Sequence, residues 1–224
     1  MKENSITSQE EVDHEIRIAN FQHRPINLKG KVLSSLLLEG RKIEQDINLD
    51  GSVLLGSISL EGTEIKGNVS LRDAIIRGAF YFGSSSLKGN IFMDNSRVEG
   101  VVNLVGANVE GNLDFQEAKI SGFLSLAKTQ IIGNVNADNA EVKDAYNSGL
   151  IIKGDFYLRE ASISGNVSAQ NILIEGSFDS LGAYIGRDLN LKGIKVENIL
   201  ILKNTKVKGN INLEGAKYKE IVKK

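Results

Sequence analysis

The sequence predicts an all-β fold: a single-stranded parallel β-solenoid (β-helix) with four sides, in which each coil takes about 22 residues. The prediction depends on an eleven-residue repeat, on apolar columns at fixed places of that repeat, and on turn-forming residues between them. Residues 56–143 divide without a gap into eight segments of eleven residues, each starting with glycine. GNVSLRDAIIR and GNLDFQEAKIS show the template: glycine, often asparagine, apolar residues at the third, fifth and tenth places, and a small residue at the eighth.

The apolar places form two inward-facing pairs in each repeat. Residues two apart on a strand point to the same face, so the third and fifth places form one pair and the eighth and tenth another. The third place holds Ile58, Val69, Phe80, Ile91, Val102, Leu113, Leu124 and Val135. Glycine occupies the first place, and the seventh place holds Gly62, Asp73, Ser84, Asn95, Gly106 and Asn139. Because these are turn-forming residues, the chain is expected to bend at both corners between short faces.

Two columns indicate that one coil contains two repeats. Asparagine follows the leading glycine at every second repeat, at Asn68, Asn90, Asn112 and Asn134. The repeats between them carry Ala79, Val101 and Phe123 at that place. Stacked coils put equivalent residues above one another, so a coil of 22 residues keeps the two kinds of side chain apart. We expect the asparagines to hydrogen-bond to one another and fix the register, rather than to line a ligand groove.

The first residues fit no repeat. Residues 1–13 are polar and acidic, and we expect a flexible tail there. The alternative is a capping helix that starts near Thr7 or Ser8, with Glu10 and Glu11 in its first turn.

The solenoid is predicted to cover residues 14–219 as nineteen half-coils, followed by a basic tail at 220–224. In its first, degraded segment the inward places hold Ile16, Ile18 and Phe21. The segment Asp144–Lys153 has ten residues, so it should form a local bulge or a tightened corner. After this segment the asparagine column changes phase, to Asn166, Asp188 and Asn210.

Composition indicates the setting of the protein. The chain has 224 residues, of which 41% are hydrophobic and 25% charged, a formal net charge of −1, and no cysteine. A chain without cysteine has no disulfide framework and fits a reducing compartment. We see no apolar segment typical of a signal peptide or a membrane span, and expect a cytoplasmic location.

Two families share parts of this pattern. The motif G-N-h-x-L-x-x-A-x-h-x, present as GNLDFQEAKIS and GNINLEGAKYK, resembles bacterial solenoids of the pentapeptide-repeat-like group over residues 14–219, although this chain alternates steps of five and six residues. The segment GNVSAQNILIEGSF is similar to segments of bactofilins, the polymer-forming β-helical cytoskeletal proteins. The first resemblance implies a rigid right-handed rod, in a group of which a few members mimic DNA. The second implies end-to-end filament assembly, and neither implies a catalytic residue.

The sequence does not indicate an enzyme. Its two histidines, His14 and His23, both lie in the degraded N-terminal part, and the many serines have no expected histidine partner. The glycines are spaced by eleven and each serves a bend, so they do not form a phosphate-binding loop. We therefore expect no cofactor, no metal site and no small-molecule substrate.

Two groups of residues are candidate interfaces. Tyr81, Val101 and Phe123 are expected to share one outer wall, with Ala145 beyond them. The second group is the basic C-terminal end, with Lys217, Lys219, Lys223 and Lys224. Residues 190–224 contain nine lysines against three glutamates, whereas residues 1–15 contain one lysine against five acidic residues, so the rod should be polarised along its axis. The expected partners are a second copy, bound laterally or end to end, another protein, or an anionic surface at the C-terminal end.

The expected function is a non-catalytic structural, scaffolding or assembly module that acts through the surface and ends of a rigid rod. The alternative is a protein-binding module of the pentapeptide-repeat type, which mimics nucleic acid and modulates a DNA-binding enzyme. Mimicry needs a strongly negative surface, whereas the formal net charge is only −1.

Overall fold

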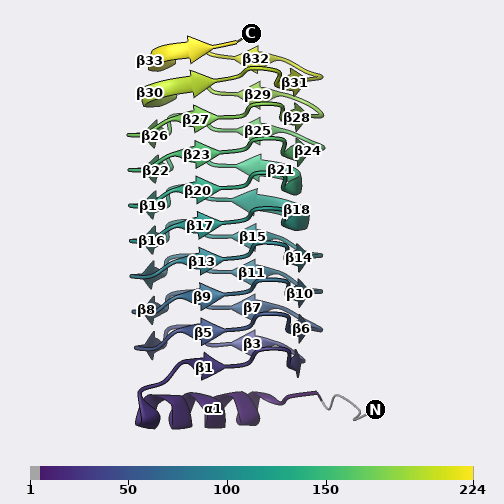
Figure 1. Ribbon diagram of the computed structural model, residues 1–224, viewed down its shortest axis with the longest axis vertical. Helices are drawn as coiled ribbons and strands as arrows, with labels where there is room; N and C mark the ends of the chain where they lie inside the picture. Colours follow the sequence, from purple (N-terminus) through teal and green to yellow (C-terminus); the bar gives the residue numbers. More distant parts are fainter. Residues whose placement is uncertain (1–5, 224) are drawn as a thin grey trace.

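Two-residue strands and the bends between them build an all-β parallel solenoid of about nine coils, each of about 22 residues (Figure 1). The structure is a computed structural model that describes residues 6–223. Each regular coil contains four strands, and each strand pairs in parallel with the equivalent strand of the next coil. The strands therefore form four walls, which we number 1 to 4 in chain order. The predicted fold class and coil length are confirmed.

The walls contain the following strands. Wall 1 contains β1 (Ile26–Asn27), β5 (Ile47–Asn48), β9 (Val69–Ser70), β13 (Ile91–Phe92), β17 (Leu113–Asp114), β20 (Val135–Asn136), β23 (Phe156–Tyr157) and β27 (Phe178–Asp179). Wall 2, on the right in Figure 1, contains β2 (Val32–Leu33), β6 (Val53–Leu54), β10 (Ile75–Ile76), β14 (Arg97–Val98), β24 (Ser162–Ile163), β28 (Tyr184–Ile185) and β31 (Lys206–Val207). Wall 3 contains β3 (Leu36–Leu37), β7 (Ile58–Ser59), β11 (Phe80–Tyr81), β15 (Val102–Asn103), β25 (Val167–Ser168), β29 (Leu189–Asn190) and β32 (Ile211–Asn212). Wall 4, on the left, contains β4 (Lys42–Ile43), β8 (Glu64–Ile65), β12 (Ser86–Leu87), β16 (Asn108–Val109), β19 (Gln130–Ile131), β22 (Ile151–Ile152) and β26 (Leu173–Ile174).

Four longer strands run round a corner from one wall to the next. β18 (Lys119–Ser125) and β21 (Glu141–Tyr146) connect walls 2 and 3. β30 (Lys195–Ile201) and β33 (Lys217–Val222) connect walls 4 and 1.

The inward columns form the core as predicted. All eight side chains at the third place are buried. Inside the coil the rings of Phe80 and Phe82 stack with their centroids 6.2 Å apart, and those of Phe156 and Phe178 meet edge to face at 5.5 Å. Because burying one large apolar side chain contributes about 1.5–3 kcal/mol, these columns are the main source of stability along the rod.

The two kinds of corner bend for different reasons. At the seventh place the backbone is left-handed, with φ of 57° at Asp73 and 54° at Ser84, which explains the glycine, asparagine and aspartate found there. The leading glycines, by contrast, do not have positive φ. A Cβ on Gly100 would lie 2.6 Å from the carbonyl oxygen of Gly78 in the coil below. The leading glycine is therefore needed for the close approach of two backbones, not for the turn chemistry that we expected.

Asparagine ladders fix the register at the corner between walls 4 and 1. The Asn68 Oδ1 accepts the side-chain amide of Asn90 at 2.8 Å and its backbone N–H at 2.9 Å, and Asn112 repeats both bonds on Asn90. Asn134 continues the ladder by donating its backbone N–H to Asn112. After the short segment a second ladder runs along the corner between walls 2 and 3, through Asp144, Asn166, Asp188 and Asn210. The predicted register-fixing role and the change of phase are both confirmed.

The residue missing from the short segment lies just before Asp144. Ile120 pairs with Val142, but Phe123 pairs with Asp144, so two residues of β18 face a single one, Lys143. Lys143 thus takes the place of two residues, Ser121 and Gly122, and its carbonyl oxygen accepts the backbone N–H of Gly165 as the Gly100 carbonyl accepts that of Gly122. With one residue fewer the corner tightens, as predicted, and the chain continues as one strand.

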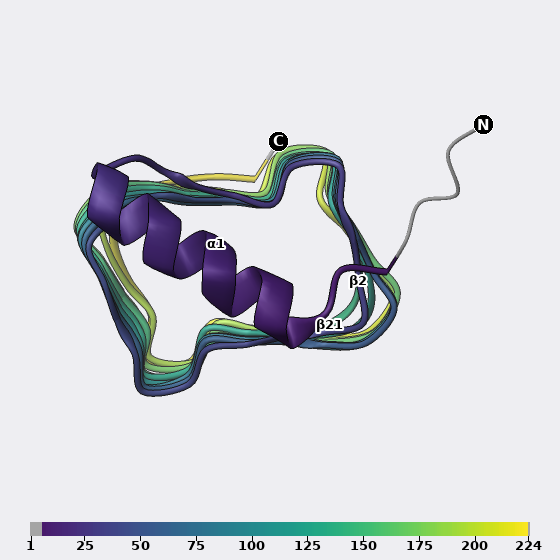
Figure 2. The same ribbon diagram turned by 90° about the horizontal axis from the view of Figure 1, so that it is seen from below.

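Residues 14–22 do not belong to the solenoid, and this part of the prediction is wrong. They lie in α1 (Gln9–Gln22), which crosses the N-terminal end of the rod (Figure 2). Ser8 and Glu11 form a capping box, in which each side chain accepts the other's backbone N–H. The expected alternative, a capping helix with Glu10 and Glu11 in its first turn, is the arrangement that the structure shows from residue 6 onward.

The helix is explained by its own periodicity. Val12, Ile16 and Ala19 recur at helical spacing and are buried in the main core cluster, whereas Phe21, which we expected to face inward, is largely exposed. At the other end, Glu220–Val222 pair with Ile199–Ile201 as part of β33 instead of forming a tail.

Substitution of a leading glycine should be far more costly than substitution of a seventh-place glycine. We expect Gly100→Ala to destabilise the rod by about 1–3 kcal/mol, because backbone atoms beneath the new Cβ must shift. The matched control is Gly106→Asn, at φ 71°, where no atom lies within 3.4 Å and asparagine occupies the equivalent position elsewhere. Its cost should stay below about 1 kcal/mol. Thermal and urea unfolding of the two variants measure the difference, and equal costs would contradict the close-approach explanation.

Candidate interaction surfaces

The predicted outer residues lie together on wall 3. Pairing of Phe80 with Val102 and of Val102 with Leu124 places Ala79, Val101 and Phe123 one above another in successive coils. Tyr81 lies in the neighbouring column of the same wall. Phe123 is 37% exposed, Tyr81 and Val101 are half-buried, and Ala79 is buried.

A fourth residue, Tyr146, completes this group and was missed by sequence reasoning. Its ring meets that of Phe123 edge to face, with centroids 5.7 Å apart, and it is 41% exposed. The tightened corner causes this contact, since it moves Asp144 opposite Phe123 and Tyr146 opposite Ser125. Ala145, which we expected on the outer wall, instead points into the core and is buried. We call Tyr81, Val101, Phe123 and Tyr146 the aromatic patch.

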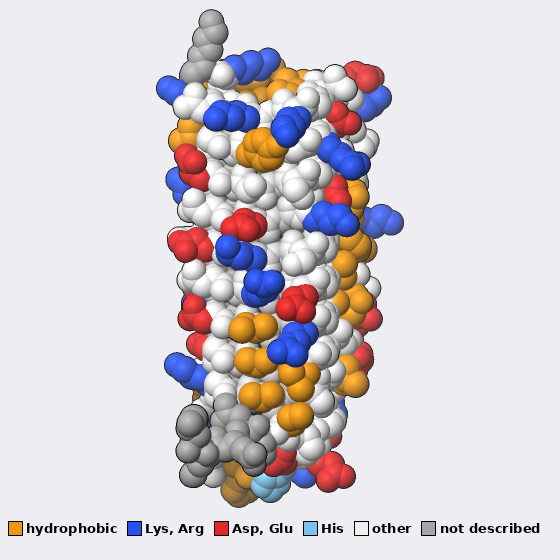
Figure 3. All heavy atoms as spheres, turned by 90° about the vertical axis from the view of Figure 1, so that its right-hand side faces the viewer, with side chains coloured by type: hydrophobic (Ala, Val, Ile, Leu, Met, Phe, Trp, Pro, Cys, Tyr) orange, Lys and Arg blue, Asp and Glu red, His pale blue; other side chains and the backbone are white. Residues whose placement is uncertain are grey.

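An aliphatic group lies on the adjoining wall 2. Val53, Leu55 and Ile75 come from two successive coils, and the last two are exposed. Figure 3, which faces this wall, shows hydrophobic side chains gathered in the lower half of the rod. Sequence reasoning missed this group because, among the outward residues, it considered only those near the start of each repeat. Apolar residues at the outward ninth and eleventh places were the signal that could have found it.

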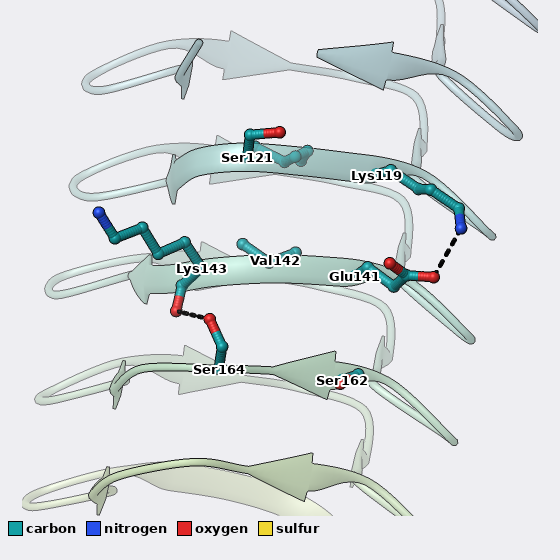
Figure 4. Close-up of a pocket in the computed structure, with 8 residues that line it drawn as sticks. Lys119, Ser121, Glu141, Val142, Lys143, Ser162 and Ser164 are labelled. Atoms are coloured by element: carbon teal, nitrogen blue, oxygen red, sulfur yellow. Dashed lines mark hydrogen bonds and ion pairs between the residues drawn. The ribbon is translucent and has the colours of Figure 1, made fainter. Parts of the chain in front are cut away.

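A shallow groove of about 410 Å³ lies on wall 2 at the tightened corner (Figure 4). Its polar lining is Lys119, Ser121, Glu141, Lys143, Ser162 and Ser164. The Lys119 Nζ is paired with the Glu141 Oε1 at 2.7 Å, and Ser164 donates to the Lys143 carbonyl oxygen at 3.4 Å. The lining contains no histidine that could activate a serine hydroxyl, so the groove has the character of a polar surface hollow.

Wall 1 is acidic. Its outward residues and those beside them carry seven aspartates between residues 46 and 181, namely Asp46, Asp50, Asp94, Asp114, Asp138, Asp155 and Asp179. Only two arginines accompany them. Arg72 lies over the Phe92 ring at 3.9 Å and Arg159 over the Tyr157 ring at 4.7 Å.

These arginines also form ion pairs with the acidic wall. Arg72 pairs with Asp94 at 3.1 Å, and Arg159 with Asp138 at 2.5 Å. Burial raises the pKa of Asp94, although Arg72 opposes the shift. The hydrogen bond to Asp155, together with burial, raises the pKa of Tyr157 to about 12. The phenol therefore stays protonated at neutral pH and acts as a hydrogen-bond donor.

The two ends of the rod differ. At the N-terminal end the buried face of α1 covers the first coil, and Thr7 forms a β-bridge with Leu33. At the C-terminal end the inward residues of the last coil are partly open to solvent. Ile211 is 46% exposed, whereas Leu189, which occupies the same position one coil earlier, is completely buried. The predicted basic residues Lys217, Lys219 and Lys223 are exposed there, and Lys224 lies outside the described residues.

Both histidines lie at the N-terminal end of the rod. His14 is on the exposed face of α1, and His23 ends the helix with a left-handed φ of 51°. Among residues 6–223 no group of three or more histidine, cysteine, aspartate or glutamate side chains could hold a metal ion.

Comparisons with known proteins add nothing to this description: no family model, curated protein or solved structure matches the chain. Within the described part of the chain no helix is long and apolar enough to cross a membrane. The class that the fold defines is therefore the parallel β-solenoid, and the surfaces must be interpreted from their own residues.

The packing of α1 against the first coil should weaken in acid. The bidentate hydrogen bond and ion pair with Arg24 lower the pKa of Glu15 below its ordinary value of 4.5. A lowered folded-state pKa stabilises the folded form above the ordinary value, and this contribution is lost as the pH falls through the lowered value. Hydrogen-exchange protection in α1 should therefore drop between about pH 5 and pH 3 more than protection in the middle coils. Arg24→Gln should reduce the pH dependence of α1, and an unchanged dependence would contradict the role of this pair.

Proposed function

We propose that this protein is a non-catalytic scaffold or assembly module, which acts through the surface and ends of a rigid rod. The observation that carries the proposal is the exposed Phe123–Tyr146 ring pair on wall 3. The inward columns already fill the core, so these rings are not needed to build the solenoid. Large aromatic side chains grouped on a fixed surface are typical of the anchor residues of protein interfaces.

Rigidity supports the same proposal. The wall that carries the rings is paired strand by strand through successive coils, and asparagine and aspartate side chains bond one coil to the next at its corners. A partner would therefore meet the rings in a preset arrangement and would lose little conformational entropy in ordering them. Catalysis is not part of the proposal, since the serine hydroxyls of the groove have no histidine beside them among the described residues.

The acidic wall 1 favours a second candidate, a module that mimics nucleic acid and binds a DNA-binding enzyme. The magnitude of its charge argues for the scaffold instead. Seven aspartates against two arginines leave five negative charges over seven coils, or one per about 7 Å at about 4.8 Å per coil. B-DNA carries one charge per about 1.7 Å. The wall would be a weak electrostatic substitute.

The two resemblances support different candidates. The resemblance to the pentapeptide-repeat-like group favours mimicry of nucleic acid, and the resemblance to bactofilins favours assembly. Both remain resemblances of the repeat pattern alone. The cytoplasmic setting expected from the cysteine-free sequence is likewise part of the proposal.

The scaffold function can be tested by removing the exposed ring of Phe123 and measuring association. Phe123→Ser should weaken self-association or partner capture about tenfold, because it removes a central apolar anchor. The thermal midpoint should fall by no more than about 4 °C, since the core is untouched. Light scattering and sedimentation measure association, and circular dichroism measures the midpoint.

The matched control is Ile151→Ser on wall 4, where the side chain is also 37% exposed but lies outside the aromatic patch. An equal effect of both variants would mean that the patch is ordinary surface. A protein that stays monomeric and inhibits a topoisomerase in a supercoiling assay would support the mimic instead.

A further inference from the structure

β33 differs from the strands of the regular coils. It runs without a break through six residues, Lys217–Val222, round the same corner as the seven-residue strand β30 beneath it. Val196 pairs with Tyr218, but Ile199 pairs with Glu220, so Lys219 alone faces two residues of β30. This is the same one-residue loss that occurs before Asp144, and it shortens the continuous strand at the end of the rod by one residue relative to β30.

One edge of β33 is open. The strand pairs with β30 on one side, and no strand of residues 6–223 pairs with its other side. The inward residue Tyr218 is exposed, and Ile221 is only partly buried, whereas Val196 and Leu200 directly beneath them are buried. Such an edge offers both backbone hydrogen-bonding groups and apolar surface to a further strand.

The side chains of β33 have a pattern that reads the same in both directions. From their register with β30, Tyr218 and Ile221 face inward, and the remaining residues face outward. When a second copy of the strand is placed antiparallel, with the two-fold axis between residues 219 and 220, each residue meets one on the same face. Tyr218 then lies opposite Ile221, and Lys219 lies opposite Glu220.

We propose that β33 pairs antiparallel with β33 of a second copy, joining two rods at their C-terminal ends. The contact is isologous, so each Lys219–Glu220 pair and each Tyr218–Ile221 pair occurs twice. Opposite charges and apolar residues directly across an antiparallel pair both stabilise it. This inference rests on the proposed assembly function and names the surface and the partner.

The acidic N-terminal end is a poorer partner for this surface. Its carboxylates are largely engaged within their own molecule: Glu15 pairs with Arg24, and Asp13 pairs with Arg41 at 2.8 Å. Glu11 accepts the Ser8 backbone N–H in the capping box. The apolar face of α1 is buried against the first coil. Head-to-tail docking would therefore have less free negative charge at the N-terminal end than the total charge suggests. It would also have little apolar surface there to bury.

Lysines set the salt dependence of the paired ends. Lys217, Lys219 and Lys223 bring net positive charge to both sides of the contact. Added salt screens this repulsion, while the apolar contact persists. C-terminal pairing should therefore strengthen, or at least hold, as salt rises, whereas docking of a basic end on an acidic one should weaken.

The experiment is a charge swap measured by sedimentation equilibrium at low and high salt. Lys219→Glu alone and Glu220→Lys alone each place like charges opposite each other twice, and should weaken dimerisation about tenfold at low salt. The double variant Lys219→Glu/Glu220→Lys restores opposite charges and should recover the affinity of the original chain. It also controls for misfolding, since both single changes are present in it.

Cross-linking identifies the geometry, because the natural chain has no cysteine. An equimolar mixture of Lys219→Cys and Glu220→Cys chains should form a disulfide between copies. A cross-link from Lys219→Cys to Gln22→Cys on α1 would overturn the strand pairing and leave the assembly function standing. A chain that is monomeric at every concentration and salt, and captures no partner through the aromatic patch, would overturn both.

Discussion

Successive coils of this rod approach so closely at the leading-glycine corners that no Cβ fits between them, and the rest of the structure depends on that approach. The coil spacing is set by the parallel hydrogen bonds of the walls, at about 4.8 Å. At most of these corners the chain bends and each wall receives a two-residue strand. One residue is missing from the corner before Asp144 and again at Lys219, where two residues of the coil below face a single one. The Phe123–Tyr146 contact and the open strand β33 both arise at these two places.

The core and the outer surface are unusually separate in such a fold. Inward columns complete the apolar packing, and carboxamide or carboxylate oxygens at the corners accept backbone N–H groups from the coil above. Little of the outward surface is therefore needed to hold the rod together. Exposed rings and aliphatic side chains on the walls can change without altering the fold, which is why their grouping is informative about contacts with other molecules.

Most of the solenoid could be predicted because its signal is repeated. The inward columns, the left-handed seventh place and the asparagine ladders each recur in many coils, so a few irregular residues do not obscure them. Single events were predicted poorly. Ile16 fits both an inward strand place and the buried stripe of a helix, and only the packing of Val12 and Ala19 beside it decides for the helix. Tyr146 was missed because the sequence shows that a residue is deleted between Asp144 and Lys153 but does not show where in the coil the deletion is accommodated. The structure accommodates it at the corner before Asp144, and this places Tyr146 opposite Ser125.

Because α1 caps the N-terminal end, the rod has a fixed reference point from which positions along its axis can be measured. α1 covers the first coil and is held there by its own buried residues, so every feature farther along can be counted in whole coils from it. A duplication or deletion of 22 residues in the middle would shift the aromatic patch and the terminal strand relative to the cap by a single coil step, and would leave the facing direction of every wall unchanged. The distance from the N-terminal cap to the aromatic patch, or to the terminal strand, could thus evolve in discrete increments, without redesign of either end.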